Sequence, residues 1–140
     1  MDTSFHYLLM VNQAKLQKML FAQLKDTCLT MGQPKILDYL KDHDGANQKE
    51  IANGCQIEAP SLTSLLGPME QKNLIERRML NGNRRSLHIF LTPKGREYQQ
   101  LIEQQFIEIE NKAFANIPDS EQEQFMETLI KISKNLCNDL

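Results

Sequence analysis

The sequence predicts a mainly α-helical protein with one small β-hairpin wing, arranged as a winged helix-turn-helix with helical segments on either side. Residues 47–72 contain two short runs of helical periodicity separated by a break. After them, Asn81-Gly82 lies between two extended segments, residues 74–78 and 84–91. Asn-Gly at such a place favours a hairpin, because both residues tolerate positive φ. A helix-turn-helix followed by a hairpin is therefore the expected centre of the fold.

Charge is unevenly distributed along the chain. Residues 71–96 carry seven basic side chains and one acidic side chain, a net charge of +6, whereas residues 1–70 carry −2 and residues 97–140 carry −6. A basic hairpin in an otherwise acidic protein is typical of contacts with nucleic-acid phosphates. The pattern favours binding of double-stranded DNA. A protein-interaction module on the same scaffold is the alternative, because a fold does not fix a function.

The composition is that of an ordinary globular protein. The chain has 140 residues, of which 41% are hydrophobic and 24% are charged, enough for one domain or for one domain with an appended dimerisation element. No apolar run approaches the roughly 18 residues of a membrane span. The start of the chain also lacks the basic segment of a signal peptide. We therefore expect a cytoplasmic protein with no membrane partner.

The cysteines and histidines do not indicate a metal site. Cys28, Cys55 and Cys137 are an odd number without a Cys-x-x-Cys pair, and the three histidines are widely separated. We expect neither a metal nor another cofactor. The sequence also lacks a Gly-rich phosphate loop and a nucleophile elbow, so we predict no catalytic residues and no enzyme activity.

The N-terminal segment is expected to be a dimerisation helix, residues 1–28. Apolar side chains recur in residues 3–25 over a surface too broad for a single stripe, with no Gly or Pro. Such a helix needs cover on more than one side, which favours contact with a partner subunit, although an extra face in the monomer's own core is the alternative. Thr30 with Gln33 is then expected to cap the next helix as a capping box.

The predicted DNA-binding domain, residues 29–95, contains the helix-turn-helix. Asn47 with Glu50 predicts the start of its first helix, and Gly54 is the expected C-cap. The second helix is expected over residues 59–72. Pro68 inside that run removes a helix hydrogen bond, so we expect a kink or an irregular turn there.

The second helix of this pair is the predicted recognition helix. Its inner face consists of apolar side chains at helical spacing, namely Leu62, Leu65, Leu66 and Met69. Its outer face near the N-terminus consists of small residues, namely Pro60, Ser61, Thr63 and Ser64. Hydroxyl groups contact phosphates and several base types, so they discriminate weakly between sequences.

The C-terminal segment, residues 96–140, is predicted to form dimerisation helices. Thr92-Pro93 is expected to open a long helix, because proline is tolerated in the first turn. Another helix is expected after Pro118, with Ser120 and Glu123 as its capping box. The glutamates of both helices are interpreted as a solvated face, because none is followed at i+3 by the histidine that a carboxylate-bridged metal site requires.

Several short motifs, in this order, resemble the MarR family of bacterial transcription regulators. They are Leu29-Thr30-x-x-Gln33, Gln48-Lys49-Glu50-Ile51-Ala52, Ser61-x-Thr63, Leu74-Ile75-Glu76-Arg77 and Leu91-Thr92-x-x-Gly95. The resemblance implies a homodimer in which the first, fifth and sixth helices interlock. It also implies that each winged domain binds half of a pseudo-palindromic operator, with the recognition helix in the major groove and the wing in the neighbouring minor groove.

The wing and recognition helix differ from the family pattern at two places. The family's wing usually carries Asp-x-Arg, whereas this chain has Asn83-Arg84-Arg85, so Arg85 takes the arginine position without the carboxylate. Ser64 stands where an arginine usually follows the recognition-helix threonine. The residues expected to contact DNA are Pro60, Ser61, Thr63, Ser64, Arg77, Asn83, Arg84 and Arg85.

The resemblance also implies regulation. Many members release DNA when a small aromatic acid or phenol binds between the dimerisation helices and the winged domain, so we expect a ligand-responsive repressor. Met10, Met19 and Met31 are flexible side chains suited to such a pocket or to a dimer core. Other members sense oxidants through cysteine, but Cys28 and Cys55 lack a basic neighbour in sequence, which favours structural thiols.

Overall fold

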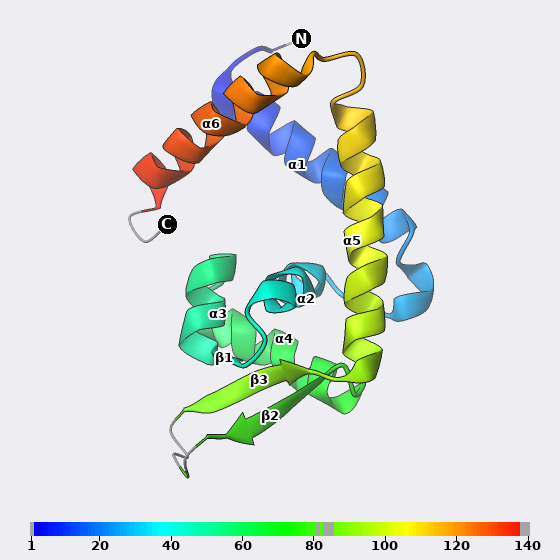
Figure 1. Ribbon diagram of the computed structural model, residues 1–140, viewed down its shortest axis with the longest axis vertical. Coiled ribbons are helices and arrows are strands. Elements are labelled where there is room, and N and C mark those ends of the chain that lie inside the picture. The colour runs from blue at the N-terminus through cyan, green and yellow to red at the C-terminus, as the bar shows by residue number, and fades with distance from the viewer. Residues whose placement is uncertain (1, 81, 83–85, 138–140) are drawn as a thin grey trace.

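A computed structural model describes residues 2–80, 82 and 86–137. In this part of the chain, six α-helices, one 3-10 helix and three strands form (Figure 1). In order, they are α1 (Phe5–Ala22), η1 (Lys25–Thr27), α2 (Gln33–Asp42), β1 (Ala46–Asn47), α3 (Gln48–Cys55), α4 (Ala59–Gln71), β2 (Ile75–Met79), β3 (Leu87–Leu91), α5 (Pro93–Ala113) and α6 (Asp119–Leu136). The predicted fold class, mainly α-helical with a winged helix-turn-helix, is confirmed.

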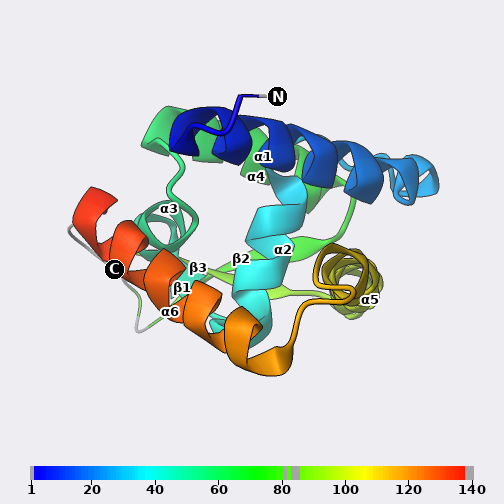
Figure 2. The same cartoon turned by 90° about the horizontal axis from the view of Figure 1, so that it is seen from above.

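The long helix α5 forms one side of the molecule. Helix α2 packs against α5, and α2, α3, α4 and the sheet lie at the level of its N-terminal half, whereas α1 crosses its C-terminal half and α6 turns back after it (Figure 1). Seen from above, α1 and α6 run along opposite edges, with α2 between them (Figure 2). The arrangement places the winged part at one end of the molecule and α1 and α6 at the other.

The hydrophobic core joins α2, α3, α4 and the sheet. Its fully buried side chains include Ile36, Leu40, Ile51, Leu66 and Ile89. Burying a side chain of this size contributes about 1.5–3 kcal/mol relative to leaving it in water. Because the core fixes α4, the predicted recognition helix, against strand β2 of the hairpin, these two elements are held in a defined relative position.

The sheet has three strands, in the order β1-β3-β2, and all pairs are antiparallel. The register of the hairpin pairs Ile75 with Leu91 and Arg77 with Ile89. The short strand β1 pairs Ala46 with Ile89 and was not expected from the sequence. Two residues carry too little period-2 pattern to be recognised as a strand. With β1 in place, β3 is the central strand.

Two helix starts agree with the sequence. The Asn47 side chain accepts from the Glu50 backbone N–H at 2.9 Å, and the Glu50 side chain accepts from the Asn47 N–H at 3.4 Å, so the capping box is confirmed. The Thr92 hydroxyl accepts from the Gly95 N–H at 2.9 Å at the start of α5. A Cβ on Gly95 would lie 1.9 Å from the Leu74 carbonyl oxygen. Glycine there permits the close approach of α5 to the start of the wing.

Two other capping predictions are wrong. Helix α2 begins after Gly32, and the Gln33 side chain instead accepts from the Thr30 backbone N–H at 2.9 Å. Helix α6 begins at Asp119 after Pro118, without a side-chain cap from Ser120. In both cases a neighbouring residue takes the N-cap place.

The helix-turn-helix also corrects the predicted role of Gly54. This residue lies inside α3, which ends at Cys55 and is followed by the C-cap residue Gln56, whose φ is 53°. A Cβ on Gly54 would lie 2.3 Å from the Tyr39 ring, so glycine is needed for close packing of α3 on α2. Helix α4 continues through Pro68 to Gln71, so the irregular turn expected at the proline does not form.

Helices α1 and α6 leave most of their apolar side chains exposed. Leu20 is the one buried residue of α1, and no described residue of α6 is buried. The exposed large apolar side chains on the two helices are Phe5, Tyr7, Leu9, Met10, Val11, Phe125, Met126, Ile130 and Leu136. A single chain therefore leaves these apolar side chains uncovered, and contiguous exposed apolar surface of this kind often marks a protein–protein contact.

Candidate nucleic-acid interface

The turn of the helix-turn-helix is built by residues 56–58. Gln56 adopts the left-handed conformation, and the Ile57 N–H then donates to the Ala52 carbonyl at 2.9 Å, which closes the end of α3. Glu58 is extended, and α4 starts at Ala59 with Pro60 in its first turn. Because proline has no N–H to leave unsatisfied, it suits this position. Residues 56–58 thus connect the end of α3 directly to the start of α4.

Helix α4 has one buried face and one exposed face. Leu62, Leu66 and Met69 are buried in the core. The four recognition-helix residues predicted to face DNA are all exposed, namely Pro60, Ser61, Thr63 and Ser64. The structure thus brings these four residues together on one accessible surface.

Two of these hydroxyl groups are already engaged within the helix. The Thr63 hydroxyl donates to the Ala59 carbonyl at 3.1 Å, and the Ser64 hydroxyl donates to the Pro60 carbonyl at 3.1 Å. Such bonds to the i−4 carbonyl are common for Ser and Thr in helices. Their hydroxyl oxygens remain available as acceptors, which limits the base edges that they can recognise.

Arg77 and Arg78 lie on opposite faces of β2. Arg77 pairs across the hairpin with the buried Ile89, so its side chain lies on the face that packs against the helices. There, its Nε lies 3.5 Å from the Glu70 Oε2 of α4, and 21% of the side chain is exposed. Arg78 is more exposed, at 56%, and forms an ion pair with Glu76. Its guanidinium also lies 4.4 Å from the centre of the Phe90 ring.

The basic residues at the base of the wing also have partners. The Lys72 Nζ donates to the Cys28 carbonyl at 2.6 Å, and the Lys94 Nζ donates to the Lys72 carbonyl at 3.2 Å. Arg96 forms an ion pair with Asp44 at 3.2 Å. Counting basic residues in the sequence therefore overestimates the number of side chains that are free to contact phosphate. Asn83, Arg84 and Arg85, the predicted wing contacts, lie outside the described residues.

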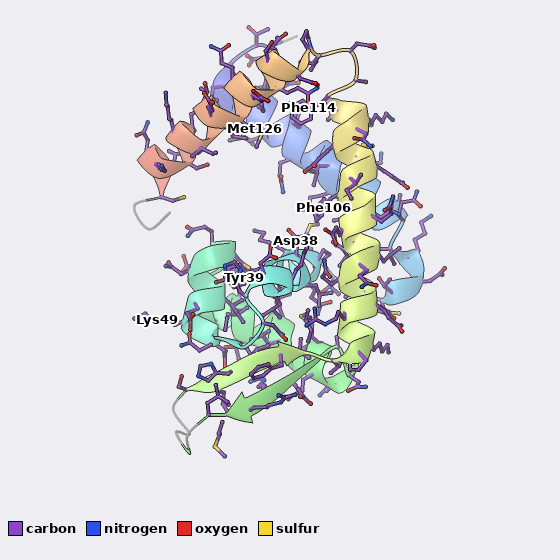
Figure 3. The ribbon with its side chains drawn as sticks, viewed as in Figure 1. Asp38, Tyr39, Lys49, Phe106, Phe114 and Met126 are labelled. Carbon is purple, nitrogen blue, oxygen red and sulfur yellow. The ribbon has the colours of Figure 1, made fainter. Side chains whose placement is uncertain are left out.

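A groove between α3 and α4 was not predicted. It is lined by Lys49, Ala52, Asn53, Gln56, Ile57, Glu58 and Ala59. Lys49 projects from α3 away from the core (Figure 3). The helix-turn-helix motif in the sequence places this groove between its two helices. The two walls come together through the left-handed conformation of Gln56.

The cysteines differ in accessibility. Cys55 is buried, and burial raises the pKa of its thiol to about 11. A neutral buried thiol is inert, which supports the structural interpretation of this cysteine. Cys28 is exposed, and Cys137 is half-buried.

No group of His, Cys, Asp and Glu suited to a metal ion occurs among residues 2–80, 82 and 86–137. None of the helices in the described chain is long and apolar enough to cross a membrane.

Comparison with known proteins agrees with this geometry. The MarR family model matches residues 29–87. The regulator PecS of Dickeya dadantii (strain 3937), an HTH-type transcriptional regulator, is 28% identical over 89 residues, which are 64% of this chain and 54% of PecS. The structure of the transcriptional regulator PA3341 is 30% identical, with a TM-score of 0.85 over 96% of this chain and 99% of that one.

A DNA complex is among the similar structures. The S. aureus MepR–DNA complex is 27% identical, with a TM-score of 0.86 over 96% of this chain and 99% of the MepR chain. The fold and the relatives define a winged helix-turn-helix transcriptional regulator, which is a class of DNA-binding proteins and not of enzymes. The chain belongs to the MarR family.

Proposed function

We propose that the protein binds double-stranded DNA in a sequence-specific way and represses transcription in the cytoplasm as a homodimer. The observation that carries this proposal is the exposed surface of α4, whose opposite face is fixed in the core beside the wing. In this proposal, residues 29–95 bind DNA, and residues 1–28 and 96–140 form the dimer. The similarity to MepR, whose structure is a DNA complex, supports the DNA-binding part.

Phosphate contacts are the first part to test. Replacing both Arg84 and Arg85 by alanine removes two positive charges from the proposed wing contact. Each lost phosphate contact lowers the slope of log K against log salt by about 0.9, so binding should weaken on all duplexes and the slope should fall by up to about 2. The control removes two exposed lysines of the C-terminal segment, Lys112 and Lys131.

Fluorescence polarisation over a range of salt concentrations measures both quantities. The control variant should keep the wild-type slope. If the wing variant also keeps wild-type affinity and slope, the wing is not a DNA contact. If the wild-type protein binds no duplex at all, the alternative of a protein-interaction module is favoured.

The dimer is proposed from the apolar surfaces of α1 and α6. Phe5, Met10 and Leu136 are 54%, 67% and 70% exposed, and the occupant that we propose for this surface is a second copy of the chain related by a two-fold axis. A two-fold dimer would place its recognition helices about 34–36 Å apart, one turn of DNA. Sedimentation at micromolar concentration should show a dimer, and Ile130→Glu on α6 should weaken it, whereas Gln124→Glu on the same helix serves as the charge-matched control. A wild-type monomer would contradict the proposal.

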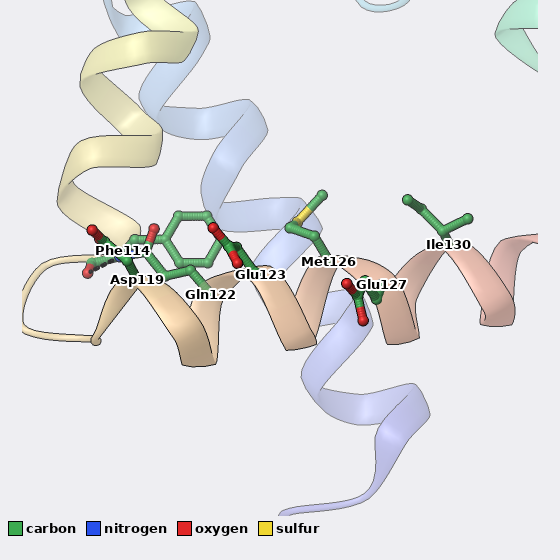
Figure 4. Close-up of a pocket in the computed structure, with 7 residues that line it drawn as sticks. All are labelled: Phe114, Asp119, Gln122, Glu123, Met126, Glu127 and Ile130. Atoms are coloured by element: carbon green, nitrogen blue, oxygen red, sulfur yellow. Dashed lines mark hydrogen bonds between the residues drawn. The ribbon is translucent and has the colours of Figure 1, made fainter.

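We propose that a small aromatic or phenolic ligand controls DNA release. An open groove lies at the corner of α5 and α6, lined by Phe114, Asp119, Gln122, Glu123, Met126, Glu127 and Ile130 (Figure 4). This corner is not the predicted place between the dimerisation helices and the winged domain. Met10 and Met31 are exposed, while Met19 packs against the core, so these three methionines do not mark a closed pocket in one chain.

Reciprocity tests ligand control. A ligand that lowers DNA affinity tenfold requires about 1.4 kcal/mol of coupling, and bound DNA must then weaken the ligand by the same factor. Calorimetry with aromatic acids and phenols, with and without operator DNA, measures this factor. Equal affinity in both states, or no binding, would contradict ligand control and favour regulation through exposed Cys28.

A further inference from the structure

The exposed start of α4 has few groups that can recognise one base rather than another. The hydroxyl protons of Thr63 and Ser64 are directed to carbonyls of their own helix. Ser61 is exposed, but a single hydroxyl serves as donor or acceptor and discriminates weakly. The groups expected from the sequence to read bases therefore leave most of the specificity unexplained.

Glu58 is the charged side chain next to this surface. It occupies the residue before α4, with an extended backbone, and its carboxylate makes no cap with the helix. It is exposed, and no hydrogen bond or ion pair joins its carboxylate to another residue in the described part of the chain. Gln56 lines the same groove, but its Nε2 already donates to the Asn53 carbonyl at 2.6 Å. The Glu58 carboxylate is thus a free acceptor at the leading end of the recognition helix.

An ionised carboxylate has a narrow choice of partners on DNA. It has no proton to donate and repels phosphate oxygens, so its favourable contacts are the amino groups at base edges. In the major groove these are cytosine N4 and adenine N6, and Glu is the side chain that typically accepts from cytosine N4. Lys49 on the α3 wall of the groove supplies a positive charge that offsets the repulsion of nearby phosphates.

We propose that Glu58 is a specificity-determining residue that accepts a hydrogen bond from the N4 amino group of a cytosine in each half-site. This inference rests on the proposed DNA-binding function. A purely structural role is the competing explanation, because a carboxylate at a helix N-terminus stabilises the helix through its dipole. The two roles differ in their consequences: the structural role affects unfolding, and the recognition role affects base choice at one position.

The experiment is a selection of bound sequences from a pool of random duplexes, followed by affinity measurements on the selected site. Wild-type protein is compared with Glu58→Gln and with Glu97→Gln. Glu97 is an exposed glutamate on α5, so its variant changes the net charge equally and lies outside the proposed interface. Thermal unfolding of all three proteins reports any effect on the stability of α4.

Wild-type and Glu97→Gln should both select cytosine at one symmetric position of each half-site. In Glu58→Gln, the preference for cytosine at this position should fall about tenfold. The preference for adenine should rise, because glutamine pairs with adenine N6 and N7. Its affinity for random DNA should rise, since one negative charge is removed near phosphates. Preferences at the other positions should stay unchanged.

An unchanged sequence preference in Glu58→Gln would overturn the proposal, and a lowered unfolding temperature with that result would assign Glu58 the structural role. Tight binding without any sequence preference in the wild-type protein would overturn it as well, while leaving DNA binding intact. Failure of the wild-type protein to bind any duplex would overturn the proposed function and this inference together.

Discussion

Replacing Arg77 by alanine tests whether this side chain contacts DNA or stabilises the fold. The sequence predicts a DNA contact, but the side chain lies on the core-facing side of β2, with its Nε 3.5 Å from Glu70 of α4. This pair joins the base of the wing to the end of the recognition helix. Since Arg77 is mostly covered and Glu70 is about half exposed, we expect Arg77 mainly to position the wing.

The size of the effect follows from the burial. A partly exposed ion pair is worth about 0–1 kcal/mol, and loss of the packed arginine stem adds to this, so Arg77→Ala should cost about 1–2 kcal/mol of stability. For a chain of this length, that corresponds to a fall in unfolding temperature of roughly 3–8 °C. Glu70→Gln should have a smaller effect of the same sign, because the arginine stem keeps its packing.

Two assays then distinguish the roles. Thermal unfolding measures stability, and the salt dependence of DNA binding counts phosphate contacts. Arg77→Ala should lower stability and keep the salt slope, whereas the control Arg78→Ala, on the exposed face of β2, should change stability by less than about 1 kcal/mol. Arg77 would instead be a phosphate contact if Arg77→Ala left stability unchanged and reduced the salt slope by about 1.

Three further substitutions test other contacts. Thr63→Ala should weaken binding to the cognate site more than to random DNA in polarisation assays, and an equal loss on both would restrict Thr63 to the DNA backbone. Gly95→Ala should destabilise by at least about 1–3 kcal/mol in denaturant unfolding, since its Cβ would lie 1.9 Å from the Leu74 carbonyl oxygen, and wild-type stability would contradict this packing. Because the pKa of Cys55 is raised to about 11 by burial, folding stability should be fully present below about pH 9 and fall by about 2–3 kcal/mol as pH rises through 11. Cys55→Ala should show a shallower fall over this range, and an identical pH profile would show that the thiol is not responsible.

The fold could be predicted from the sequence because its signals are local. Asn47 with Glu50 and Thr92 before Pro93 define helix starts through side-chain caps, and both caps form. The C-cap prediction for Gly54 is wrong because a glycine near a helix end resembles a C-cap, whereas here Tyr39 packs where its Cβ would be. Contacts between distant segments leave no local pattern in the sequence, and the two-residue strand β1 is too short to show one.

The site was predicted less completely than the fold. The exposed face of α4 follows from helical periodicity, so Ser61 and Thr63 lie where expected. Which basic residues are free depends on partners that are distant in sequence. Lys72 contacts the Cys28 carbonyl 44 residues away, and Arg96 contacts Asp44 52 residues away. Counting charges along the chain cannot reveal these partners.

The partners of the basic residues also determine how DNA affinity can arise. Arg78 and Arg96 pair with exposed or half-exposed carboxylates, and such pairs cost only about 0–1 kcal/mol to exchange. A phosphate can therefore replace either carboxylate at little cost, whereas Lys72 would have to give up its 2.6 Å bond to the Cys28 carbonyl in the segment between η1 and α2. The basic residues near the wing thus differ in how easily a phosphate can displace their present partners. Phosphate binding should recruit Arg78 first and leave Lys72 in place, which keeps α4 anchored while the wing adapts to the DNA.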